Sequence, residues 1–160
     1  VTTDLSVEIW FWAEDHNGLL LYSGPEATTG YKGGDFVSVG IVNGRLEFLF
    51  NLGSGIANIT TSDPITLSQW HKVVARRTLR DGSLRIDNFP ISNGSAPKPW
   101  DKLNLNNAPV YIGGVRNMAP ISVITGISQG FYGAMQKVVL NGIEIKTLFE
   151  VSSTRTQSLL

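Results

Sequence analysis

The sequence predicts an all-β protein, either a sandwich of two sheets or a barrel. Short runs rich in Val, Ile, Leu and aromatic residues recur about every 8 to 12 residues, separated by Gly, Asn, Asp and Ser. No stretch keeps an apolar period of about 3.6 residues over three helical turns. With 160 residues, of which 42% are hydrophobic, the chain is long enough to bury one sizeable core. Many short strands at this spacing favour sheets that each bury one face.

The first predicted strands lead into a hairpin. Residues 5–13 alternate apolar and polar side chains, and residues 18–24 form a short apolar run. Two further runs, 35–42 and 45–52, flank the dipeptide Asn43-Gly44. This dipeptide is the strongest short signal for a hairpin, because a type I′ turn needs positive φ at both central residues.

The remaining strands are shorter and separated by turn residues. They are predicted at residues 55–61, 70–77, 83–88, 109–114 and 133–142. Asp81-Gly82 predicts a second hairpin turn. Residues 92–100 are predicted as a loop, and the apolar segment 118–130 as a loop that either borders a binding rim or packs over a sheet edge. We expect one domain over residues 1–150, with a short helical candidate at 146–151 and a frayed tail at 151–160.

Several kinds of chemistry are missing. The histidines are His16 and His71, without metal-ligand spacing, and there is no cysteine for thiol catalysis. Neither GxSxG nor GxxxxGK[ST] occurs, and the thirteen acidic residues show no paired pattern of the kind that glycosidases use. The sequence therefore predicts that the protein is not an enzyme. Zero formal net charge argues against a nucleic-acid binder, and no apolar run approaches a membrane span.

Six segments, in this order, carry a resemblance to a known family: GLLLYSG, GDFVSVGIVNGRLEFLFNLGSG, QWHKVVARR, SLRIDN, VYIGG and GFYGAMQKVVLNG. Together they resemble the laminin G-like domain, also called the LNS domain, and most closely the domains of agrin and perlecan. The resemblance implies a two-sheet antiparallel jelly-roll sandwich of about fourteen strands. It also implies a non-catalytic binding module of a secreted, extracellular-matrix or cell-surface protein with several domains.

One position departs from the family pattern. Members commonly carry a cysteine where this chain has Ala134, paired with another cysteine near the C-terminus, and this chain has none. The departure puts in doubt how the C-terminal tail is anchored.

The resemblance also implies a Ca²⁺ site on one rim. The ligands would be the side chains of Asp35 and Asn104 and the carbonyls of Leu52 and Lys102, with Asn106 as a substitute if the loop register differs. A hairpin that turns at Asn43-Gly44 independently places residues 35 and 52 at the same end. With one carboxylate we expect a weak site, with a dissociation constant of about 10⁻⁴ to 10⁻³ M. The alternative is that Asp35 caps a turn and the asparagines serve loop conformation.

Basic and aromatic residues are candidates for ligand contacts. Four arginines form a candidate patch for heparan sulfate: Arg76, Arg77, Arg80 and Arg85. The alternative is an ordinary solvated edge, and strand alternation would send neighbouring arginines to opposite faces. Trp100, in a loop, is a candidate partner contact, whereas three tryptophans within strands are predicted to lie in the core: Trp10, Trp12 and Trp70.

The sequence thus predicts calcium-assisted binding of an acidic extracellular glycan or glycoprotein, either the glycan of α-dystroglycan or heparan sulfate. The alternative is a calcium-independent adhesion or receptor-binding domain. The sequons at Asn58 and Asn93 are compatible with glycosylation and secretion. No nucleic acid and no membrane insertion are expected.

Overall fold

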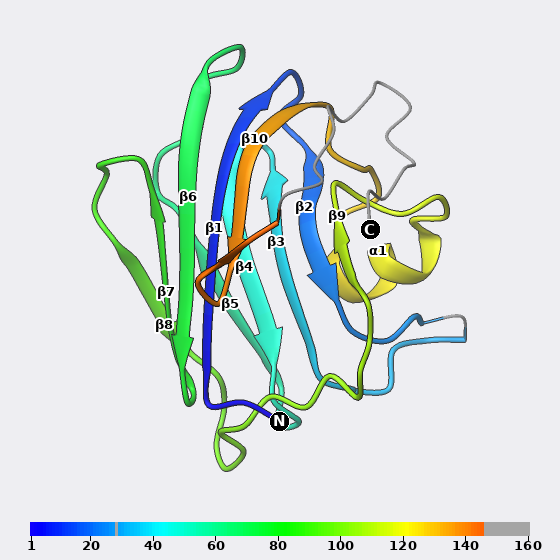
Figure 1. Cartoon of the computed structure of the whole chain (residues 1–160). Coiled ribbons are helices and arrows are strands. Elements are labelled where there is room, and N and C mark those ends of the chain that lie inside the picture. The colour runs from blue at the N-terminus through cyan, green and yellow to red at the C-terminus, as the bar shows by residue number, and fades with distance from the viewer. Residues whose placement is uncertain (28, 146–160) are drawn as a thin grey trace.

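Two antiparallel sheets pack face to face in the computed structural model of the chain, which describes residues 1–27 and 29–145 (Figure 1). One sheet contains β1 (Asp4–Ala13), β6 (Trp70–Thr78), β7 (Asp81–Ile86), β8 (Ser92–Ser95), β10 (Gly133–Leu140) and β11 (Ile143–Glu144). The other contains β2 (Gly18–Ser23), β3 (Phe36–Val42), β4 (Arg45–Asn51), β5 (Ile56–Thr60) and β9 (Val110–Ile112). The strand orders are β11-β10-β1-β6-β7-β8 and β5-β4-β3-β2-β9.

This arrangement confirms the predicted all-β, two-sheet sandwich. The described residues contain eleven strands, fewer than the expected number of about fourteen. The predicted domain end at residue 150, the helical candidate 146–151 and the tail 151–160 lie outside the described residues.

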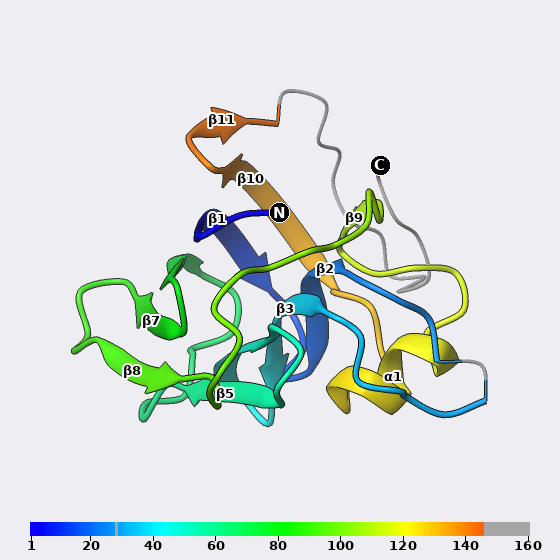
Figure 2. The same cartoon turned by 90° about the horizontal axis from the view of Figure 1, so that it is seen from below.

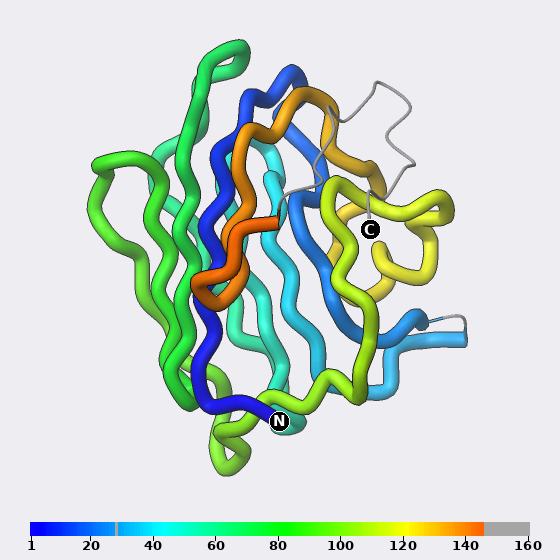
Figure 3. Tube along the Cα trace, viewed as in Figure 1, coloured from blue at the N-terminus to red at the C-terminus, as the bar shows by residue number. Residues whose placement is uncertain are grey.

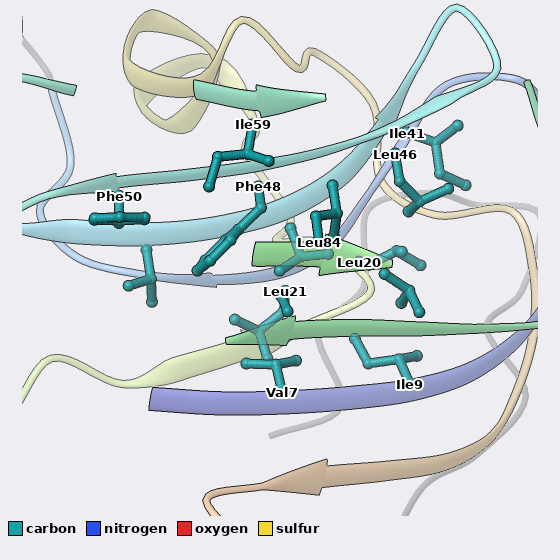
Figure 4. Close-up of a cluster of buried hydrophobic side chains, with 14 of the residues drawn as sticks. Val7, Ile9, Leu20, Leu21, Ile41, Leu46, Phe48, Phe50, Ile59 and Leu84 are labelled. Atoms are coloured by element: carbon teal, nitrogen blue, oxygen red, sulfur yellow. The ribbon is translucent and has the colours of Figure 1, made fainter. Parts of the chain in front are cut away.

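The main core fills the space between the two sheets. Strand β1 shows how it forms: its residues alternate between buried and partly exposed, so one side of the strand faces the other sheet. Figure 4 shows side chains from both sheets meeting in this layer, among them Val7, Ile9, Leu20, Leu21, Ile41, Leu46, Phe48, Phe50, Ile59 and Leu84. All ten are at most 2% exposed.

A second apolar cluster lies on the outer face of the five-stranded sheet. The helix α1 (Ala119–Thr125) covers this face and buries Ile121 and Ile124 there, together with Leu19 and Leu49 from the sheet (Figure 2). The prediction of a loop over residues 118–130 was therefore wrong for the helical part. Valine and isoleucine are only moderate helix formers. A helix of seven residues is also too short to show a clear helical period of apolar residues in the sequence.

The two hairpin predictions had different outcomes. Asn43 and Gly44 have φ values of 50° and 83° and join β3 to β4 as predicted. Asp81-Gly82 does not form a turn, because Thr78 pairs with Asp81 and the chain reverses at residues 79–80. Gly82 instead lies in β7, where an added Cβ would stand 2.6 Å from Ile59 Cδ1 in the opposite sheet.

Two further predictions need correction. Part of the predicted loop 92–100 is the edge strand β8, which pairs with β7. The tryptophans of β1 and β6 are not in the core: Trp10 and Trp12 are partly exposed, and Trp70 is 43% exposed. All three lie on the outer face of the six-stranded sheet, because they share the strand parity of the exposed residues.

Candidate functional site

The rim of the sandwich brings together segments that are far apart in the sequence. Figure 3 shows the N-terminal residues, the long connection that leads to β9 and the open end of the β3–β4 hairpin at the same end of the molecule. Phe36 pairs with Asn51 at that end of the hairpin. The next residues outward, Asp35 and Leu52, therefore lie opposite each other, as the position of the turn predicted.

The connection to β9 is fixed against the N-terminus. Thr2 and Leu103 exchange two backbone hydrogen bonds, each of 2.9 Å. In an extended segment, the backbone groups of the flanking residues point to the opposite side. Asn104 N–H follows this rule and donates to Asp35 Oδ2 at 2.8 Å. By the same alternation, we expect the carbonyl of Lys102 to face the side of Asp35.

Asn51 shapes the turn beside Asp35, and sequence reasoning missed it. Its Oδ1 accepts hydrogen bonds from the backbone N–H groups of Gly53 and Gly55, at 2.8 and 3.2 Å, and its Nδ2 donates to Tyr31 Oη at 2.7 Å. Asparagine two residues before glycine at a strand end is a common turn signal, and it was available in the sequence.

Trp100 borders the same turn. An added Cβ on Gly53 would stand 3.2 Å from Trp100 Cδ1 and 3.7 Å from Asp35 Oδ1, so the glycine separates the indole from the carboxylate. The backbone N–H of Trp100 donates to Ser54 Oγ at 3.2 Å, and the residue is 60% exposed. The rim therefore combines a carboxylate, carbonyl and amide oxygens and one exposed aromatic wall.

The oxygens on the rim fit Ca²⁺ in kind, since this ion prefers carboxylate, amide and carbonyl ligands. They are few: Asp35 supplies the carboxylate, and Asn104 Oδ1 already accepts a hydrogen bond from the N–H of Asn106 at 3.2 Å. No group of three or more His, Cys, Asp or Glu side chains placed to hold a metal occurs in the described residues. The turn-capping alternative also has a contact in its favour, because Asp35 accepts the Asn104 bond. The calcium site stays a prediction.

Arg77 is 1% exposed and so does not belong to a surface patch, which corrects its assignment as a glycan contact. Its guanidinium donates to the carbonyls of Leu79 at 2.6 Å, Thr2 at 2.9 Å and Asp101 at 3.3 Å. Burial lowers the pKa of this guanidinium, and nearby carboxylates, Asp35 among them, oppose the shift. Through these hydrogen bonds Arg77 holds the three rim segments together, and it adds a positive charge near Asp35.

The other three predicted arginines do not form one cluster. Arg80 is half-buried and donates to the carbonyl of Ala96 at 2.9 Å. Arg76 and Arg85 are exposed, and both line a hollow on the outer face of the six-stranded sheet. Strand alternation separates this pair from Arg77, because it puts Arg76 and Arg77 on opposite sides of β6.

The sequon asparagines lie on two neighbouring edge strands. Asn58 on β5 and Asn93 on β8 are both exposed. An added Cβ on Gly94 would stand 2.8 Å from Ile59 Cγ1, so the two sequons come close together along one side of the sandwich.

The two histidines have different surroundings. His16 is exposed, whereas His71 is 4% exposed and bonds through Nδ1 with Asp87 Oδ2 at 2.6 Å and through Nε2 with the carbonyl of Thr66 at 2.7 Å. Both ring nitrogens of His71 are therefore engaged in holding a loop.

In the described part of the chain, no helix is long and apolar enough to cross a membrane.

Comparison with known proteins points to one family. Residues 11–146 match the Laminin G domain. The basement membrane-specific heparan sulfate proteoglycan core protein of mouse, perlecan, is 38% identical over 139 residues, which are 87% of this chain and 4% of that protein. Human pikachurin is 34% identical over 149 residues, which are 93% of this chain and 14% of that protein. The chain therefore spans only a small part of the relatives it matches.

Solved structures agree on the fold. Domains LG4-5 of the mouse laminin α1 chain superpose with a TM-score of 0.78 at 19% identity, covering 91% of this chain and 37% of that one. A sialidase CBM40 of Ruminococcus gnavus bound to α2,3-sialyllactose superposes with a TM-score of 0.65 at 12% identity, covering 90% of this chain and 78% of that one. At these identities the likeness shows the architecture alone.

Proposed function

Because the chain belongs to the Laminin G domain family, we propose that it is a non-catalytic, extracellular binding module that recognises an acidic glycan or glycoprotein at the Asp35 rim. The predicted resemblance to this family is thereby confirmed. The observation that carries the proposal is the contact between Asp35 Oδ2 and Asn104 N, which unites two loops 69 residues apart at the position where the resemblance implies calcium.

Each rim residue has a defined part in this proposal. Asp35, Asn104 and the carbonyls of Leu52 and Lys102 would hold Ca²⁺, which when bound supplies a positive charge with open positions for ligand oxygens. The Thr2–Leu103 bridge keeps the Lys102–Asn104 segment extended. Trp100 would contact the neighbouring part of the ligand, and Asn106 would adjust the loop through its bond to Asn104.

The names of the relatives support the cellular setting. Two of them are named as basement membrane proteins, which favours a secreted or matrix location. We propose the glycan of α-dystroglycan or heparan sulfate as ligand, within a longer protein whose neighbouring domains lie outside this chain. Glycosylation at Asn58 and Asn93 belongs to the same proposal, because both side chains are exposed.

A thermal melt with calcium titrated from micromolar to 10 mM tests the site. With a dissociation constant of about 10⁻⁴ to 10⁻³ M, mass action adds roughly 1.4 to 2.7 kcal/mol at the highest concentration. We expect the melting temperature to rise by about 3 to 10 °C. The rise should vanish in Asp35→Ala and persist in Asp63→Ala, which removes an exposed carboxylate elsewhere. A flat response in the wild type would refute the calcium site.

One alternative function has its own support. Among the four proposed ligands Asp35 alone is acidic, and the buried Arg77 cation lies near it, which weakens calcium binding and favours a calcium-independent protein partner. Trp100, exposed and flat, is the kind of residue that anchors protein interfaces. Partner binding that survives EDTA and is lost in Trp100→Ala would support this alternative.

A further inference from the structure

The outer face of the six-stranded sheet carries aromatic and basic side chains that the rim function does not use. Strand register places them in rows: Trp12 opposite Trp70, then Trp10 opposite Lys72, and farther along the sheet Arg76 opposite Ser83. Six steps along β1 from its residue 12 to its residue 6 span about 20 Å. The face is therefore long enough for an extended ligand.

One end of this face is aromatic. The Trp12 and Trp70 rings lie 5.9 Å apart at 72°, which is an edge-to-face pair, and Trp70 is 43% exposed. Lys72 Nζ lies 5.3 Å from the centre of the Trp10 ring and 2.9 Å from Glu8 Oε1. These contacts hold the indoles in place while part of their surface stays open to solvent.

Next to the aromatic end, along β6 and β7, lies a basic hollow of about 240 Å³. Its lining residues include Lys72, Val74, Arg76, Arg85 and Ile91. Arg85 is tied to the adjoining loop, since Nε donates to the carbonyl of Phe89 at 3.0 Å. The side chain of Arg76 makes no hydrogen bond or ion pair with any other residue in 1–27 or 29–145, so its guanidinium is available to a ligand.

The carboxylates near the hollow are already engaged. Glu8 pairs with Lys72, and both oxygens of Asp87 are used, by His71 and by the N–H of Lys72 at 2.8 Å. Three basic side chains, Lys72, Arg76 and Arg85, against the two carboxylates leave the hollow with one net positive charge. Such a hollow is complementary to sulfate or carboxylate groups, which match the planar donors of arginine.

We propose that this outer face is a second, calcium-independent binding surface for an acidic glycan strand. A pyranose ring would lie with its apolar face on Trp70, and a sulfate or carboxylate farther along the strand would occupy the hollow beside Arg76. An extended peptide fits less well, because it gains affinity by pairing with a sheet edge, and this face offers no free backbone groups. A protein partner fits less well too, because charged residues are depleted at the centre of such interfaces.

Binding of a heparin octasaccharide to the whole chain, measured by calorimetry in EDTA at low and high salt, tests the proposal. We expect measurable affinity that falls with salt, since exposed charge pairs are screened. Arg76→Glu should weaken binding at least tenfold, while Arg116→Glu, an equal charge change at another exposed arginine, should leave it nearly unchanged. Trp70→Ala should weaken binding several-fold, and Val123→Ala, which changes an exposed apolar residue on α1, should not.

Several results would overturn the proposal. Absence of binding at millimolar octasaccharide in EDTA would do so, as would equal losses in the two arginine variants, which would indicate nonspecific charge attraction. No loss in Trp70→Ala would remove the stacking contact, and tight binding of a polyglutamate peptide of matched charge would remove the preference for a glycan. The calcium-dependent melt of Arg76→Glu reads the rim separately, so failure of one proposal leaves the other intact.

Discussion

The two outer faces of the sandwich differ in what covers them. On the five-stranded sheet, α1 and its flanking segments bury Leu19, Tyr22 and Leu49 in a second apolar cluster. On the six-stranded sheet, Trp70 and Arg76 stay exposed. Strand alternation gives every sheet two faces, but it does not say which one another element will cover. The chain covers the outer face of one sheet with its own helix and leaves the aromatic outer face of the other sheet exposed. This difference favours the exposed face as a binding surface.

The covered face should depend strongly on the helix. Ile121 is a fully buried residue of α1, so Ile121→Ala should lower the free energy of unfolding by about 2 to 5 kcal/mol. Val123 lies on the same helix but is 55% exposed, and Val123→Ala should cost less than about 0.5 kcal/mol. Urea unfolding followed by tryptophan fluorescence measures both. Equal effects would mean that the helix does not cover this face in solution.

The open face should contribute much less to stability. Trp70→Ala removes a half-exposed ring and its edge-to-face contact with Trp12, so we expect a loss of about 1 kcal/mol. Unfolding in urea followed by circular dichroism measures it, with Trp70→Phe as the control that retains an aromatic contact. A loss as large as that of Ile121→Ala would contradict an open face and would weaken the second binding surface.

The covered face should also show a pH signature. Glu47 shares the strand parity of Leu49 on β4, and burial raises the pKa of its carboxyl above the ordinary value of 4.5. Because the carboxyl of Glu47 holds its proton more tightly in the folded state, protonation favours folding. This contribution to stability is fully present below the pKa of the unfolded state, and it is lost as the pH rises through the pKa of the folded state. Glu47→Gln should therefore exceed the wild type in stability at pH 7, by less than about 1 kcal/mol after solvent screening, and match it below pH of about 4.

Urea melts of the wild type and Glu47→Gln across this pH range measure the difference. Glu26→Gln, which changes an exposed carboxylate, serves as the matched control and should follow the wild type. A Glu47→Gln curve parallel to the wild type at every pH would show that the carboxyl is well solvated, and that the cover over β4 is looser than the structure indicates.

Local patterns predicted much of this fold. Asn43-Gly44 marked the turn that sets the β3–β4 register, and that register placed residues 35 and 52 together before any contact was known. The same parity rule would have placed Trp10 and Trp12 outside, since they alternate with buried residues of β1. The prediction that these tryptophans lie in the core relied on their size. It was wrong because large aromatic rings are often only partly buried.

The sequence by itself determined the all-β architecture, the main hairpin and the opposite directions of Arg76 and Arg77, because neighbours along a strand must face opposite sides. Only the tertiary structure decided which of the two arginines is buried. The answer depends on Thr2, 75 residues away, whose carbonyl the Arg77 guanidinium reaches, and on the bridge from Thr2 to Leu103 that presents Asn104 to Asp35. Such contacts join segments that no local pattern links, so the rim exists only once the two sheets have packed.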